Sequence, residues 1–150
     1  NFCVGYIYYS LDGIPDTQEI YFSAGYDTFL KPTLTYYQDI EEGKGGFLVA
    51  SIGHSVELSK DVNLNLGASA SYNFKNAVMG FDRNGNKFNN LYNGEVSASV
   101  NIPVSKAIVV TPKAAYSFAL SNDAKDAISG FSVDGKKNIF YGGVNLTLSF

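Results

Sequence analysis

The sequence predicts an all-β protein, built as a transmembrane antiparallel up-and-down β-barrel of at least eight strands. Apolar and polar residues alternate with period two in eight segments of about 10 residues, as they do in transmembrane barrel strands. Short and longer connections alternate between these segments. The final segment, FYGGVNLTLSF, remains apolar on one face up to its last residue. Because chain ends usually fray, we expect this apolar ending to lie in a closed barrel within a lipid bilayer.

The composition supports strands and excludes several classes of function. The 150 residues suit one domain, and 11 Tyr, 11 Phe and 15 Gly with only 4 Pro favour strands and turns over helices. A net charge of -3 without a basic stripe argues against nucleic-acid binding. The single Cys3 and single His54 exclude an internal disulfide and a zinc site with two histidines. No run of about 18 apolar residues predicts a transmembrane helix, and we expect neither cofactor nor metal.

Four segments in the first half of the chain have one apolar and one more polar face. They span residues 2–11, 19–27, 33–40 and 46–58. The apolar positions of the last three are Ile20, Phe22, Ala24, Tyr26, Leu34, Tyr36, Ile40, Leu48, Ala50, Ile52, Val56 and Leu58. The positions between them in the third segment are Thr33, Thr35, Tyr37 and Asp39. This alternation predicts strands with one apolar side.

Four further segments repeat the pattern over residues 62–74, 91–102, 107–120 and 140–150. In the clearest of them Val62, Leu64, Leu66, Ala68, Ala70, Tyr72 and Phe74 alternate with Asn63, Asn65, Gly67, Ser69, Ser71 and Asn73. Pro112 cannot donate to a ladder, so we expect a bulge or a local break there. No stretch predicts a helix.

The connections predict how the strands are oriented. Residues 28–32, 59–61 and 103–106 are short connections, whereas 75–90 and 121–138 are long and polar. The connections at 12–18 and 41–45 are intermediate. In a meander all the short turns then lie at one end, as in outer-membrane barrels with short periplasmic turns. Aromatic residues near the strand ends would form two girdles; they are Tyr26, Tyr36, Tyr72, Phe74, Tyr92, Phe118, Phe140 and Phe150.

The more polar face predicts a wet lumen. It consists mostly of Ser, Asn, Thr and Gly, whereas a soluble exterior would carry many more Lys and Glu. Such small side chains fill an eight-stranded barrel poorly, so either the lumen holds water or the barrel has more strands. The charged residues with this parity are Glu19, Asp39, Glu57, Glu95 and Lys113. Four acids against one base predict a weak cation preference, unless these groups pair or are simply solvated.

Two local patterns are better interpreted as parts of a strand and a turn than as a catalytic site and a calcium site. His54 and Ser55 are adjacent in a strand and point to opposite faces, so they cannot form a catalytic pair. Asp82, Asn84 and Asn86 begin like a calcium loop, but Lys87 and Asn93 occupy the positions of its glycine and its closing glutamate. We expect turns at Asn84-Gly85 and Asp134-Gly135 instead.

Several segments resemble Gram-negative outer-membrane barrels of the TorF-type porin family. They are FCVGYIYYSLDG, EIYFSAGYDTFLKPTLTYYQDIE, GHSVELSKDVNLNLGASASY and the terminal YGGVNLTLSF. The resemblance implies further strands upstream, which would make residues 1–150 the C-terminal part of a larger barrel. It also implies that Leu146, Leu148 and Phe150 belong to the signal read by the barrel-assembly machinery. The family offers no catalytic residues.

The sequence therefore predicts a porin-like channel of the bacterial outer membrane for passive diffusion of small hydrophilic solutes or ions. Its expected partners are outer-membrane lipids, the assembly machinery, solutes and either further copies of itself or a partner of its external loops. A structural or adhesive barrel, binding a partner through residues 81–88 and 131–133, is the first alternative. A soluble lipocalin-like barrel with an apolar ligand site is the second. An enzyme is not expected, since no acid, base and nucleophile converge.

Overall fold

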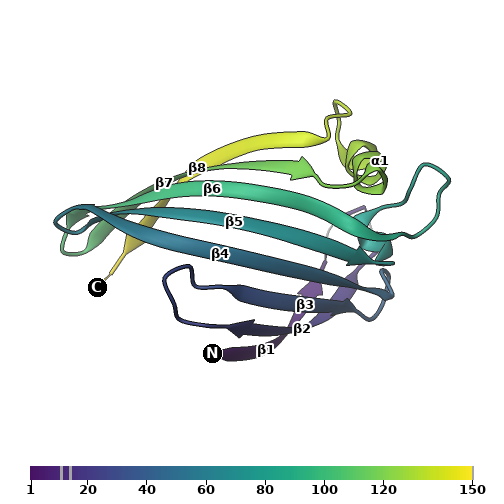
Figure 1. Cartoon of the computed structure of the whole chain (residues 1–150), viewed down its shortest axis with the longest axis horizontal. Coiled ribbons are helices and arrows are strands. Elements are labelled where there is room, and N and C mark those ends of the chain that lie inside the picture. The colour runs from purple at the N-terminus through teal and green to yellow at the C-terminus, as the bar shows by residue number, and fades with distance from the viewer. Residues whose placement is uncertain (11, 14, 150) are drawn as a thin grey trace.

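The computed structural model describes residues 1–10, 12–13 and 15–149, and eight strands form one antiparallel sheet in chain order (Figure 1). All eight predicted strands are confirmed, with their ends shifted by a few residues. Their bounds are Phe2–Tyr9 (β1), Thr17–Gly25 (β2), Thr33–Asp39 (β3), Gly45–Ser59 (β4), Val62–Phe74 (β5), Asn89–Ser105 (β6), Ile108–Ala119 (β7) and Asn138–Leu148 (β8).

The sheet is an open meander. Each strand pairs with the next along the chain, and β1 and β8 are the two edges. The predicted up-and-down topology is therefore confirmed, but the described residues do not close into a barrel, because no ladder joins β8 to β1.

The connections gather at two ends, as predicted. Residues 26–32, 60–61 and 106–107 connect strands at the left of Figure 1, and 10–16, 40–44, 75–88 and 120–137 do so at the right. We call the right-hand side the long-loop end and the left-hand side the short-turn end. The predicted alternation of length is wrong at 26–32, because this connection is as long as that at 10–16 and longer than that at 40–44.

Both long connections contain helical structure that the sequence did not predict. Residues Ala77–Met79 form a 3-10 helix (η1), and Asn122–Phe131 form an α-helix (α1). Ser121 caps α1 by accepting a hydrogen bond from the Ala124 N–H at 3.1 Å, and Asp123 favours the positive end of the helix dipole. No helix among the described residues is long and apolar enough to cross a membrane.

The two faces of the sheet differ in exposure. The apolar face carries the even-numbered residues of most strands and is open to solvent; Phe22 is 52% exposed and Val144 is 71% exposed. The polar face carries the odd-numbered residues, and η1 and α1 fold against it. Most of the buried residues lie at the long-loop end of the polar face: Thr17, Glu19, Asp39, Asn73, Asn76, Phe88, Ala124 and Ala127. The core is therefore at one end of the molecule.

A bulge corrects the predicted position of one aromatic residue. Ala70 pairs with Gly94 but Tyr72 pairs with Leu91, so β6 carries one extra residue between Leu91 and Gly94. Such a shift moves side chains to the other face. Leu91 therefore lies on the apolar face, and Tyr92, predicted for the aromatic girdle, packs against Phe47 with ring centroids 5.4 Å apart.

Pro112 produces a local break without a bulge. The β6–β7 register is the same on both sides of it, Ser99 with Lys113 and Ile102 with Val110. The two pairs between them are absent from the ladder, since proline has no N–H to donate. The Thr111 hydroxyl instead donates to the Asn101 side-chain oxygen at 3.1 Å.

Candidate functional site

A cavity of about 660 Å³ lies on the polar face at the long-loop end. β1 and β4 contribute to one wall and the long connections to the other, so the sheet curves around it. The strand residues of the wall are Ile7, Tyr9, Thr17, Glu19, Tyr37, Phe47 and Val49. The principal residues from the connections are Glu42, Met79, Phe81 and Phe131. The cavity is within the size range of small-molecule sites and is mostly apolar and aromatic.

The two long connections pack together over this cavity. Gly80 lies so close to α1 that a Cβ there would be 2.9 Å from the Ala127 Cβ and 2.9 Å from the Phe131 ring. Arg83 reaches Asp126 with a nitrogen–oxygen distance of 3.6 Å. Helix α1 is fixed to the sheet by the Asn90 side-chain amide, which donates to Asp123 at 3.0 Å. These contacts hold Phe81 and Phe131 at the cavity.

The 75–88 connection is also tied to the β3–β4 turn. The Lys87 ammonium donates to the Gly43 carbonyl at 2.8 Å, and the Ala77 N–H donates to the same oxygen at 3.1 Å. Phe88 stacks on Tyr92 with centroids 6.3 Å apart. The connection therefore lies across the end of the polar face.

Asp39 anchors the β3–β4 turn. Its side chain is fully buried, and it accepts hydrogen bonds from the Thr17 hydroxyl at 2.7 Å and the Gly43 N–H at 2.7 Å. The N–H groups of Glu41 and Lys44 donate to it at 3.0 and 3.2 Å. Predicted as a lumen charge, Asp39 lies on the expected face, but its oxygens are engaged by the fold and are not presented to solutes.

Glu19 is the charged group of the cavity wall. It is the register partner of Asp39 and only 6% exposed. Its Oε2 accepts from the Tyr9 hydroxyl at 3.0 Å. Among the described residues its Oε1 accepts no hydrogen bond, and no lysine, arginine or histidine forms an ion pair with it. A nearly buried carboxylate with one free oxygen, and no counter-ion among the described residues, therefore lines a mostly apolar cavity.

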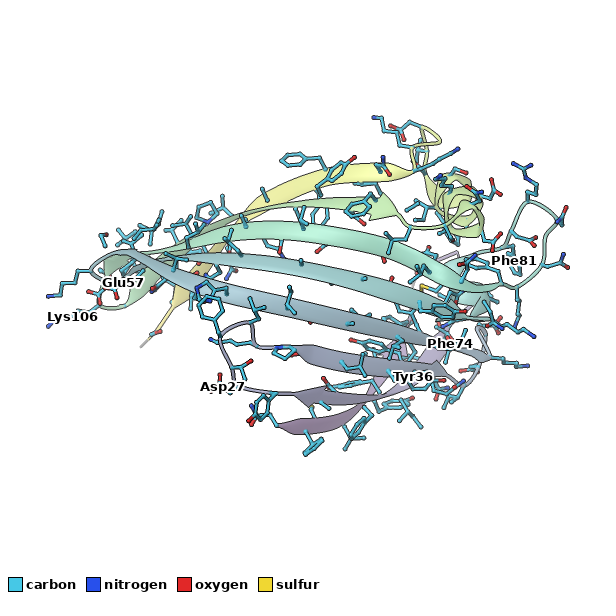
Figure 2. The ribbon with its side chains drawn as sticks, viewed as in Figure 1. Asp27, Tyr36, Glu57, Phe74, Phe81 and Lys106 are labelled. Atoms are coloured by element: carbon cyan, nitrogen blue, oxygen red, sulfur yellow. The ribbon has the colours of Figure 1, made fainter. Side chains whose placement is uncertain are left out.

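The other predicted lumen charges lie elsewhere on the polar face. Glu95 accepts from the Tyr141 hydroxyl at 2.7 Å, and exposed Lys113 is paired in register with Ser99. Glu57 is exposed at the short-turn end, opposite to Phe81 (Figure 2). The five residues share a face, as predicted, but they are spread along it and do not form one charged ring.

Two buried side-chain amides near the cavity have nitrogens without a hydrogen-bond partner among the described residues. Asn73 and Asn76 use their side-chain oxygens to accept the N–H groups of Asn76 and Val78, both at 3.0 Å. Their Nδ2 atoms have no hydrogen-bond partner among the described residues. Buried polar groups are normally satisfied, so these two are suited to ordered water.

The alternative sites weighed on the sequence are structural. His54 Nδ1 lies 2.9 Å from the Phe29 carbonyl oxygen, and the His54 ring lies 4.0 Å from the Phe29 ring, so His54 contacts the 26–32 connection. Asp82 accepts from the N–H groups of Asn84 and Asn86, both at 2.8 Å, which closes the predicted turn at Gly85. No cluster of three metal-ligating side chains occurs in the part of the chain that the structure describes.

The second predicted turn, at Asp134-Gly135, forms at the tip of the last connection. The Lys136 ammonium donates to Asp134 at 2.6 Å, and the Ser132 hydroxyl donates to it at 2.7 Å. These two donors, Lys136 first, lower the pKa of Asp134 well below its usual range. The turn is fully exposed.

The residues of the expected assembly signal are exposed where they are described. Leu146 and Leu148 are 58% and 59% exposed on the apolar face of β8. Phe150 lies outside the described residues.

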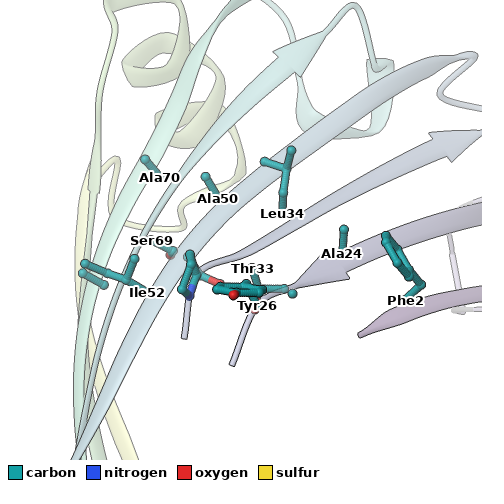
Figure 3. Close-up of a pocket in the computed structure, with 13 residues that line it drawn as sticks. Phe2, Ala24, Tyr26, Thr33, Leu34, Ala50, Ile52, Ser69 and Ala70 are labelled. Atoms are coloured by element: carbon teal, nitrogen blue, oxygen red, sulfur yellow. The ribbon is translucent and has the colours of Figure 1, made fainter. Parts of the chain in front are cut away.

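The apolar face has a hollow of its own, about 780 Å³ in volume. It forms where the small side chains of Ala24, Ala50 and Ala70 leave space beside Leu34, Ile52 and the rings of Phe2 and Tyr26 (Figure 3). Its polar atoms are few, so it presents no chemistry of its own.

Sequence reasoning found Glu19 but missed the cavity around it. Met79, Phe81 and Phe131 lie in connections predicted as polar loops, and Thr17 was placed in a loop before β2. The only available signal was the apolar spacing of Ala124, Ala127, Ile128 and Phe131, which suits a helix face.

Comparison with known proteins finds no matching family model, no significantly similar curated protein and no significantly similar solved structure. The resemblance to TorF-type porins stays a prediction.

Proposed function

We propose that this chain is part of an outer-membrane β-barrel that forms a porin-like channel for passive diffusion of small hydrophilic solutes or ions. The observation that carries the proposal is the exposed apolar face, which continues across all eight strands and is backed by a polar face. Soluble proteins rarely expose apolar patches of more than a few hundred Å², whereas the outside of a membrane barrel is apolar and its inside polar. The two ends of the sheet also differ as the short-turn and loop ends of such barrels do.

Closure of the barrel belongs to the proposal. An unpaired edge strand in a bilayer would leave its N–H and C=O groups without partners, so only closed sheets span membranes. Further strands between β8 and β1, as the TorF-type resemblance implies, would pair both edges and widen the lumen. A wider lumen is consistent with the small Ser, Asn and Thr side chains of the polar face.

The test is conductance of the protein carrying this chain, refolded in detergent and inserted into planar bilayers. We expect stepwise, salt-dependent conductance with a weak cation preference. Insertion without any conductance steps would contradict the channel. Barrel folding is followed separately by circular dichroism and by heat-dependent migration on gels, so that a misfolded sample is recognised.

One alternative retains support from a specific observation. Phe131 is 65% exposed, Phe81 is 46% exposed, and Val133 is fully exposed at the long-loop end. Exposed apolar residues on loops are suited to a partner, so a structural or adhesive barrel is the second candidate. Under this alternative the intact protein shows no conductance, and deleting residues 132–136, which removes Val133, weakens partner binding. The soluble lipocalin-like candidate needs inward-facing apolar residues, and the exposed apolar face argues against it.

A further inference from the structure

We propose that the polar-face cavity binds a small organic cation, a primary ammonium carried on an aromatic or alkyl group, with Glu19 as its counter-ion. This inference deepens the proposed function, on which it rests for the cavity's position at the external mouth of a channel. It names the class of solute that the mouth would retain.

The charge of the cavity selects a cation. Glu19 is 6% exposed and presents an oxygen with no hydrogen-bond donor among the described residues. Taking a carboxylate out of water without a counter-ion is costly, and a bound ammonium removes much of that cost. Glu42 adds a second acid to the wall. The ammonium of Lys87, in the connection that covers the cavity, is engaged by the Gly43 carbonyl at 2.8 Å.

The remaining residues of the cavity wall favour a ligand that carries an apolar group. Tyr9, Tyr37, Phe47, Phe81 and Phe131 supply aromatic rings, and Ile7, Val49 and Met79 supply aliphatic surface. Aromatic faces attract organic cations, and this attraction is stronger where water is excluded. A small inorganic cation would gain little from these walls, because no cluster of three metal-ligating side chains occurs among the described residues. An ammonium on an aryl or alkyl group can pair with the Glu19 carboxylate and pack against the apolar and aromatic wall at the same time.

The position of the cavity suits a binding step before passage. It lies at the end where the 75–88 and 120–137 connections meet, and these connections supply two of its aromatic residues, Phe81 and Phe131. A site at the mouth of a channel raises the local concentration of its solute, provided that binding is weak enough to allow release.

The experiment compares three probes of matched shape on the refolded protein by isothermal titration calorimetry. They are phenethylammonium, neutral 2-phenylethanol and anionic phenylacetate. We expect the order of affinity to be cation, then neutral, then anion, with at least about a tenfold step between the first two, equivalent to about 1.4 kcal/mol. Equal affinity for cation and neutral probe, or no binding of the cation, would overturn the inference.

The variants assign the effect to this cavity. Glu19→Gln keeps an acceptor for the Tyr9 hydroxyl and should remove the preference for the cation while leaving 2-phenylethanol binding unchanged. Glu57→Gln removes the same charge at the other end of the molecule (Figure 2). It should therefore change neither the preference for the cation nor the binding of 2-phenylethanol. Phe81→Ala should weaken both probes. If Glu57→Gln reduces cation binding as much as Glu19→Gln does, the effect is one of net charge and the inference is wrong.

Conductance of the same preparation separates this inference from the proposed function. Glu19-dependent binding without conductance would contradict the channel and keep the site. Conductance that phenethylammonium does not reduce, in a protein that does not bind it, would contradict the site and keep the channel.

Discussion

At the residue scale, two adjacent carboxylates with the same parity have opposite roles. Asp39 and Glu19 are register partners, and the sequence gives no reason to separate them. Asp39 is surrounded by donors from the β3–β4 turn and from Thr17, whereas Glu19 has one donor among the described residues, the Tyr9 hydroxyl. The alternation of residues along a strand predicts which face a side chain lies on. The hydrogen-bond donors at that position decide whether a carboxylate stabilises the fold or remains free for a ligand.

The role of Asp39 predicts a large loss of stability on truncation. Asp39→Ala would leave buried N–H groups and the Thr17 hydroxyl without an acceptor, so we expect it to lower the free energy of unfolding by about 2–4 kcal/mol. Urea unfolding in detergent measures this loss. Asp27→Ala is the control, because Asp27 is exposed in the 26–32 connection, and a change below about 0.5 kcal/mol is expected there. Similar losses in both variants would contradict the anchoring role of Asp39.

At the element scale, the strands could be predicted from the sequence and the connections could not. Strand alternation is a local pattern, and all eight segments were found in the right order. Helix α1 was missed because its apolar residues are few among polar ones, and Tyr92 was placed on the wrong face because a bulge shifts β6. The cavity was missed because Phe81 and Phe131 meet through contacts between distant connections.

Packing on the apolar face gives a second prediction at this scale. Gly94 lies beneath the Phe118 ring, and a Cβ on Gly94 would be 2.6 Å from the nearest ring atom. Gly94→Ala would displace that ring, so we expect a loss of about 1–3 kcal/mol in the free energy of unfolding. Gly143→Ala is the matched control, since a Cβ there meets nothing within 4 Å.

The cause of this loss can be tested with a second substitution. Replacing Phe118 by leucine should recover part of the loss in the Gly94→Ala background, because a leucine leaves room for the added methyl group. A double variant as unstable as the sum of the two single variants would show that the two side chains do not interact.

At the scale of the whole molecule, the exposed apolar face and the two open edges both support the proposed closed barrel in a membrane. In water, an apolar face spanning eight strands and two unpaired edge strands would both favour aggregation. In the proposed outer-membrane barrel, lipid would cover this face and closure would pair the edges. For that proposed barrel the unequal ends predict one orientation, with the short-turn end in the periplasm and the long-loop end outside.

This orientation can be tested by cysteine labelling in intact Gram-negative cells. Cys3→Ser removes the single native thiol, and Arg83→Cys or Lys106→Cys then places one thiol in the 75–88 connection or in the 106–107 turn. Both positions are exposed, and the 75–88 connection and the 106–107 turn lie at opposite ends of the molecule (Figure 1). We expect a membrane-impermeant maleimide too large for porins to label Arg83→Cys in intact cells and Lys106→Cys only after lysis. The reverse pattern would contradict the orientation, and labelling of both in intact cells would contradict a spanning barrel.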